Sequence, residues 1–197
     1  MSETATSSTP ASDGFPRRSA RTQQFTLGEP RTITVSPDGL RVVFLRSRRG
    51  DDAATCLWVL DLATATERLV ADPRELLTLY TDLAPDERAR RERVRERAEG
   101  ITSYATDTAV RVATFTLGDR LFTAGLISGG SRRLDVPGPV FDPRPDPTAS
   151  RLAYVRENAL VVAALDGSTT VIASDDDENV SWGRAEFVAA EEMGRFR

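Results

Sequence analysis

Histidine and lysine are missing from this chain, and cysteine occurs once, at Cys56. Without histidine, no Ser-His-Asp or Cys-His catalytic group is completed within these residues, and zinc sites built on imidazole are excluded. Without lysine, Schiff-base chemistry and the phosphate-binding lysine of a P-loop are excluded as well. The single cysteine heads an apolar run, which predicts a small buried side chain and no intramolecular disulfide.

Long apolar runs and an excess of positive charge are also missing. No stretch approaches the ~18 consecutive apolar residues of a membrane span, and the formal net charge is −4. Residues 1–24 lack the apolar core of a secretory signal. These features predict no membrane partner, no nucleic-acid partner and a cytoplasmic location. The composition, 40% hydrophobic and 28% charged over 197 residues, is typical of a globular domain.

The first residues differ in texture from the rest of the chain. Residues 1–27 are rich in Ser, Thr, Ala and Pro, with a small basic group at Arg17, Arg18 and Arg21. Such a stretch has little to bury, which predicts a disordered tail. Residues 28–197 are then the domain itself.

From Arg31 onward, short apolar runs alternate with turn residues, which predicts antiparallel strands. The pattern repeats three times, with four runs in each unit. The predicted strands are 32–35, 40–45, 56–62 and 67–70, then 101–105, 110–117, 120–126 and 132–136, then a run beginning at 140–141, followed by 151–155, 159–165 and 169–173.

The spacing of the units indicates the architecture. Asp38, Asp107 and Asp146 are expected at matching turns, and the last two are one unit apart. A unit of ~40–45 residues with four strands is typical of a β-propeller blade. At ~42 residues per blade the chain holds about three, whereas closed propellers have at least about four. The sequence therefore predicts an all-β, incomplete β-propeller whose open edges favour association, including a homo-oligomer.

An insertion separates the first two units, over residues 72–100. Asp72 followed by Pro73 and Glu75 predicts a helix start, because an acceptor at the cap and a Glu three residues on are typical there. Residues 84–99 predict a second helix of mixed charge, exposed to solvent and held by pairs four residues apart.

The segment after the third unit carries the chemistry. The acids at 174–178 predict a solvated loop, since a calcium loop of the EF-hand type needs a mid-loop glycine. Residues 185–193 then predict a short helix that ends with the adjacent Glu191 and Glu192. Two neighbouring carboxylates near a helix C-terminus fit either an ordinary exposed surface or a cation site. Neither a metal nor a cofactor is predicted.

The stretch WGRAEFVAAEEM (182–193), placed after three blade-like units and an Arg-rich insertion, resembles the propeller of dipeptidyl peptidase IV-like enzymes, serine peptidases of the prolyl oligopeptidase family. In that family a double glutamate grips the free α-ammonium of a peptide substrate, and the resemblance puts Glu191 and Glu192 in this role. Trp182, Glu186 and Phe187 match the residues that lead up to the pair. The family's substrate-carbonyl arginine matches no particular arginine here.

The resemblance implies the N-terminal propeller portion of such a peptidase, with a peptide N-terminus as its partner. The family's further blades and its catalytic α/β-hydrolase domain are not found in these 197 residues, so no catalysis by this chain alone is expected. One alternative is a non-catalytic propeller protein that completes itself with another chain. Another is a chance β-repeat in which the Glu-Glu pair has no function.

Overall fold

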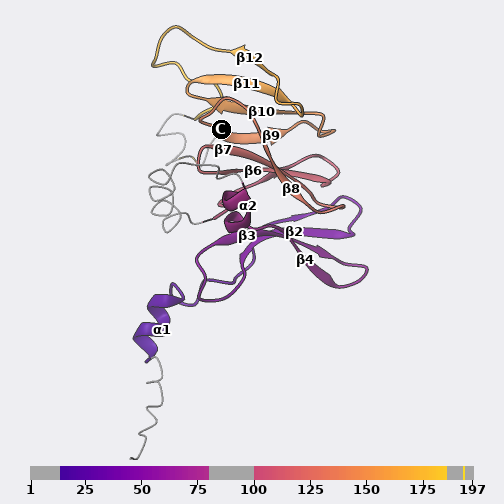
Figure 1. Cartoon of the computed structure of the whole chain (residues 1–197), viewed down its shortest axis with the longest axis vertical. Coiled ribbons are helices and arrows are strands. Elements are labelled where there is room, and N and C mark those ends of the chain that lie inside the picture. Colours follow the sequence, from indigo (N-terminus) through magenta and orange to yellow (C-terminus); the bar gives the residue numbers. More distant parts are fainter. Residues whose placement is uncertain (1–13, 80–99, 186–192, 194–197) are drawn as a thin grey trace, which may run out of the picture.

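The computed structural model describes residues 14–79, 100–185 and 193, and nearly all of its regular structure is β-sheet. Three four-stranded antiparallel sheets follow one another along the chain, and within each sheet the strands lie in sequence order. The sheets are stacked along the long axis of the molecule (Figure 1). This is the predicted incomplete propeller, with one sheet for each predicted blade.

Each predicted run overlaps one strand of the structure. Blade one contains β1 (Arg31–Val35), β2 (Arg41–Ser47), β3 (Thr55–Asp61) and β4 (Thr66–Ala71). Blade two contains β5 (Ala105–Thr106), β6 (Val112–Leu117), β7 (Arg120–Gly125) and β8 (Ser131–Leu134). Blade three contains β9 (Phe141–Pro145), β10 (Arg151–Arg156), β11 (Ala159–Ala164) and β12 (Thr169–Ala173).

The predicted strand over 101–105 is wrong for most of its length, because only Ala105 and Thr106 pair with β6. The residues before them pack on blade one instead. Ile101 is fully buried and its N–H donates to the Thr55 carbonyl at 2.9 Å. A strand that pairs over its whole length with β6 would remove Ile101 from this core.

Two short helices flank blade one. Within the segment expected to be a disordered tail, Phe15–Arg21 forms α1, and the Phe15 and Phe25 rings lie 5.9 Å apart. The predicted helix start in the insertion is confirmed as α2 (Pro73–Leu79), where the Arg74 N–H donates to the Asp72 carboxylate at 2.8 Å. Neither helix, at 7 residues, is long enough to span a membrane. The second predicted helix and residues 1–13 lie outside the described residues.

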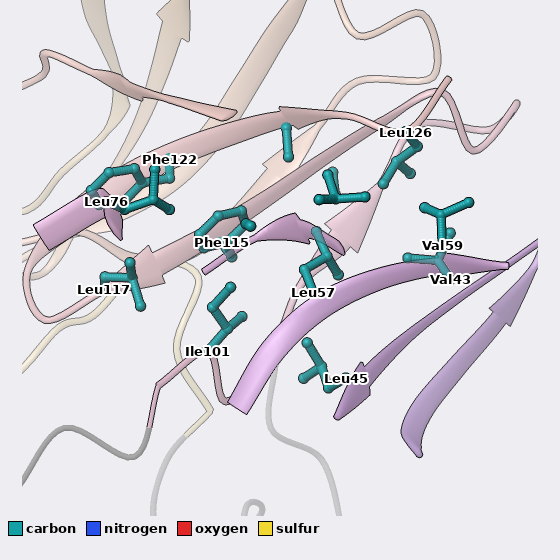
Figure 2. Packing of buried hydrophobic residues seen from close by; sticks show 14 of the residues in the cluster. Val43, Leu45, Leu57, Val59, Leu76, Ile101, Phe115, Leu117, Phe122 and Leu126 are labelled. Atoms are coloured by element: carbon teal, nitrogen blue, oxygen red, sulfur yellow. The ribbon is translucent and has the colours of Figure 1, made fainter. Parts of the chain in front are cut away.

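Two apolar clusters join the three blades. One lies between blades one and two, where Phe115 and Phe122 stack with ring centroids 5.8 Å apart and pack against Leu57 and its neighbours (Figure 2). The other lies between blades two and three, where Leu121 packs with Tyr154. Adjacent residues of β7 therefore point to opposite neighbours, and blade two is buried on both faces because side chains alternate along a strand.

The turn between the first two strands of each blade has the same geometry in all three blades. Ser36, Asp107 and Asp146 hold the same place: the backbone N–H of each donates to the carbonyl five residues on, at 2.9, 3.3 and 2.8 Å. Two of the three expected aspartates thus match, but Asp38 lies two residues further on. In blade one the Ser36 hydroxyl accepts the Arg41 N–H at 2.9 Å, as the carboxylates do in the other blades, and Asp38 accepts from Ser36 in turn.

These turn carboxylates are held in their charged form. Burial raises the pKa of Asp107, but the Val112 and Arg111 N–H groups and the Arg111 guanidinium lower it more, so the net pKa lies below the usual 3.8. Burial also raises the pKa of Asp146, and bonds from the Thr148 hydroxyl and several N–H groups bring it below 3.8. A carboxylate that accepts backbone N–H bonds favours ionisation.

Acid should therefore destabilise the fold. Because the folded pKa of Asp107 is depressed, its stabilising contribution is complete above pH 3.8 and is lost as the pH falls through the lower folded pKa. We expect Asp107→Asn to flatten the fall in the free energy of unfolding between neutral and acidic pH, measured by urea denaturation. The control Asp176→Asn, at an exposed side chain, should keep the wild-type slope. Equal slopes for both variants would contradict this role.

The same turn also tests backbone strain. Its fourth residue is left-handed in every blade, with φ of +69° at Gly39, +52° at Val110 and +59° at Ala149. In this region a side chain costs ~1–2 kcal/mol. Part of this cost is offset, because glycine loses more conformational entropy on folding than a residue with a side chain does. We expect Ala149→Gly to raise the free energy of unfolding by about 0.5–1 kcal/mol and Gly39→Ala, whose Cβ would meet nothing within 4 Å, to lower it similarly. Thermal melts that moved in the same direction for both variants would refute the shared geometry.

Candidate functional site

The double-glutamate segment begins on blade three and continues outside the described residues. Glu186, Phe187, Glu191 and Glu192 are not among the described positions, so no geometry is assigned to the predicted amine site. Its approach, residues 178–185, is described. We call residues 178–184 the strap, because they cross the surface of blade three directly before the predicted site.

Asn158, in the turn between β10 and β11, holds the strap at two points. Its side-chain amide donates to the Glu178 carbonyl at 2.8 Å, and its backbone carbonyl accepts the Trp182 N–H at 2.9 Å. The Trp182 ring itself is 43% exposed. The residue that the family resemblance singled out is thus fixed through its backbone while its ring faces solvent.

The next two residues lie directly on the blade. Gly183 has φ +79°, and a Cβ there would stand 2.8 Å from Val155 Cγ2 and 3.5 Å from Leu160 Cδ1. Only glycine combines this backbone conformation with so close an approach. The Arg184 guanidinium lies 4.7 Å from the centroid of the Phe141 ring, a cation–π contact. The strap therefore fixes where the chain leaves blade three.

The acidic loop before the strap is exposed, and its carboxylates bind their own backbone. The Asp177 carboxylate accepts the Asn179 N–H at 2.9 Å and its side-chain amide at 2.8 Å, and these bonds lower the pKa of Asp177. The Asp175 carboxylate accepts the Asp177 N–H at 3.0 Å. Among the described residues no three Cys, Asp or Glu side chains gather in a way that could hold a metal ion.

Cys56 has the predicted character of a small apolar side chain. It is 1% exposed, and burial, together with the nearby Asp72 carboxylate, raises the pKa of its thiol to about 12. A thiol so held is protonated at neutral pH and is a poor nucleophile.

The sequence analysis did not find the polar bonds that join the blades. An arginine at the same place on two outer strands, Arg68 on β4 and Arg132 on β8, donates to a carbonyl in the next blade: Leu126 at 2.9 Å and Leu165 at 3.2 Å. We call this contact the arginine clamp. The corresponding residue on β12 is Thr170. Arg68, Arg132 and Thr170 each pair with the equivalent residue on the third strand of their own blade. Two surface arginines give no periodic signal, so pattern reasoning overlooks them.

Hydroxyl groups make a second set of links. The Tyr104 hydroxyl lies 2.6 Å from the Thr32 carbonyl and 3.0 Å from the Val43 carbonyl, so it ties blade two to blade one. In the next interface the Thr114 hydroxyl donates to the Pro143 carbonyl at 2.9 Å. The Thr114 bond is buried, whereas the Tyr104 hydroxyl is partly exposed. These bonds lie at the inner strands and complement the clamp at the outer ones.

Arg46 covers the free face of blade one, the face turned away from blade two. Its guanidinium lies 5.3 Å from the centroid of Phe44 and 4.7 Å from that of Trp58, and it is paired with Glu67 at 3.1 Å. The Trp58 indole N–H donates to the Arg46 carbonyl at 2.8 Å. An aromatic pair is thus held on this face in a fixed orientation.

Comparison with known proteins adds little about activity. No family model matches the sequence. Among solved structures the chain is similar to TolB from Acinetobacter baumannii, with 11% identity and a TM-score of 0.47, over 75% of this chain and 33% of that one. The chain thus spans about a third of the length of that protein. The fold assignment therefore depends on the three sheets of this chain.

The strap provides a local test. We expect Gly183→Ala to detach it, because the added methyl combines the cost of a left-handed residue with a clash at Val155. If the substitution destabilises the attached strap by ~1–2 kcal/mol, the population of the open strap rises about 5–30-fold. Tryptic cleavage after Arg184 should accelerate by that factor. The matched control is Gly130→Ala, which has φ +83° but nothing within 4 Å of the new Cβ, and should leave this cleavage rate unchanged. Equal rates in both variants would show that the strap is not held by Gly183.

Proposed function

We propose that this chain is the N-terminal propeller portion of a dipeptidyl peptidase IV-like serine peptidase, in which Glu191 and Glu192 bind the free α-ammonium of a peptide and the propeller gates access. The observation that carries the proposal is the WGRAEFVAAEEM stretch, which follows three blades in the order that the family resemblance implies. A cytoplasmic location stays a prediction from the sequence.

The chemistry of the pair supports amine binding. An α-ammonium has three donors, and two ionised carboxylates can accept two of them as charge-assisted bonds. A bound cation also relieves the repulsion between neighbouring carboxylates. Because the amine is anchored at a fixed point, only a bond at a set distance along the peptide reaches the nucleophile of the hydrolase domain. The anchored strap supports this role, since it fixes the start of the segment that carries the pair.

A second candidate function is favoured by the blade faces. Among the described residues, no blade covers the outward face of blade one or that of blade three. Ile33 and Ile172, at 62 and 56% exposed, are large apolar side chains of the terminal blades. An interaction protein that completes its propeller with another chain would use these blades.

Amine binding can be tested on the chain without its hydrolase partner. We expect a short peptide with a free N-terminus to bind, and its N-acetylated form not to, in calorimetric titrations. Loss of one charge-assisted bond, at about 1.5–3 kcal/mol, should weaken binding ~10–100-fold in Glu191→Ala or Glu192→Ala. Asp176→Ala, which removes an exposed acid from the neighbouring loop, is the control. Peptidase activity should be absent throughout. Equal binding of the free and acetylated peptides would refute the proposal.

A further inference from the structure

The three blades can be superposed residue by residue from their turns and strand registers. In each blade the face toward the preceding blade carries a bulky pair: Phe115 with Phe122 in blade two, and Tyr154 with Val161 in blade three. These four residues are at most 1% exposed, because the neighbouring blade covers them. We call this face of a blade its head face and the opposite one its tail face.

Blade one carries the same pair on its head face. Phe44 and Trp58 are paired across β2 and β3 as Phe115 and Phe122 are across β6 and β7. Arg46 lies over both rings, and blade three has Arg156 at the equivalent place. An arginine at this position is therefore compatible with a packed joint between blades. The head face of blade one thus has the composition of the internal joints, with Phe44 4% exposed and Trp58 half-buried under Arg46.

The tail face of blade three is the complementary surface. Ala153 and Val162 are paired across β10 and β11 and hold the places of Val43 and Val59, which are 0 and 3% exposed beneath blade two. In blade three both are only half-buried. The strap covers one end of this face, where Gly183 lies against Val155 and Leu160.

We propose that copies of this chain associate head to tail, with the head face of blade one seated on the tail face of blade three of a second copy. The joint would repeat the two joints already present within the chain. Two copies joined at both ends would hold twice the three sheets that the described residues of one copy form, which falls in the range of about 4–8 blades of closed propellers. The inference deepens the second candidate function and is independent of amine binding.

One element of the internal joints is incomplete in this contact. In blade three, Thr170 occupies the position of the clamp arginine. For an arginine at that position, the acceptor in the second copy would be the Leu62 carbonyl, which is equivalent to those of Leu126 and Leu165. Thr170→Arg should therefore complete the clamp and tighten association about tenfold or more, the effect of one charged hydrogen bond. Ala153→Arg also adds a positive charge to the tail face of blade three, but at a position that the head face of the second copy must cover. This variant should therefore abolish association.

Mixing two blocked variants distinguishes this joint from other contacts. We expect the wild-type chain to exceed 21.5 kDa in light scattering, with a concentration-dependent mass. Ala153→Arg blocks the tail and Trp58→Glu blocks the head, so each should be monomeric alone, while a mixture should form a one-to-one dimer, since a heterologous contact needs one face of each kind. Ser128→Arg, on the middle blade, should associate as the wild type does.

Three results would overturn the proposal: a monomeric wild type, a Trp58→Glu variant that still dimerises through two tails, or a mixture that stays monomeric while circular dichroism shows both variants folded. Peptide titration of the same samples reports amine binding separately, so failure of one proposal leaves the other measurable.

Discussion

The structure depends on one requirement, which is that each four-stranded sheet must have both of its faces covered. Blade two meets it within the chain, and its central strand shows the result: Leu121 packs toward blade three and the adjacent Phe122 toward blade one. Within the described residues, a neighbouring blade covers only one face of each terminal blade. The two remaining faces differ. The Arg46 guanidinium lies over the aromatic pair of blade one, whereas Ala153 and Val162 of blade three are only half-buried.

Much of this architecture is contained in local patterns. Alternating apolar runs such as 40–45 and 159–165 each became a strand, and the Asp107 and Asp146 turns fell at equivalent places. Local patterns failed where a tertiary contact decided the outcome. Residues 101–104 have the composition of a strand, but Ile101 is buried against blade one and the Tyr104 hydroxyl bonds to it. At the first turn, the Ser36 hydroxyl holds the place that the sequence predicts for the Asp38 carboxylate.

For the candidate site too, one part was predicted from the sequence and another part came only from the structure. Residue types and order identify Glu191 and Glu192 as an amine-binding pair by resemblance, and nothing in the described residues tests that role. What the structure adds is the attachment of the preceding strap through Asn158 and Gly183. This attachment could not be predicted from the sequence, because it depends on a left-handed glycine lying against a side chain from another strand. The arginine clamp escaped prediction for a related reason, since its acceptors are backbone carbonyls.

Those acceptors have an evolutionary consequence. A main-chain carbonyl is present whatever residue occupies the position, so the bonds from Arg68 and Arg132 require a particular side chain on one blade only. A duplicated gene segment encoding one blade would carry its own donor and find an acceptor in any neighbour of similar shape. Sequence drift in the receiving blade would leave the bond intact. Such a joint lets propeller genes lengthen, shorten or recombine while neighbouring blades diverge beyond recognition.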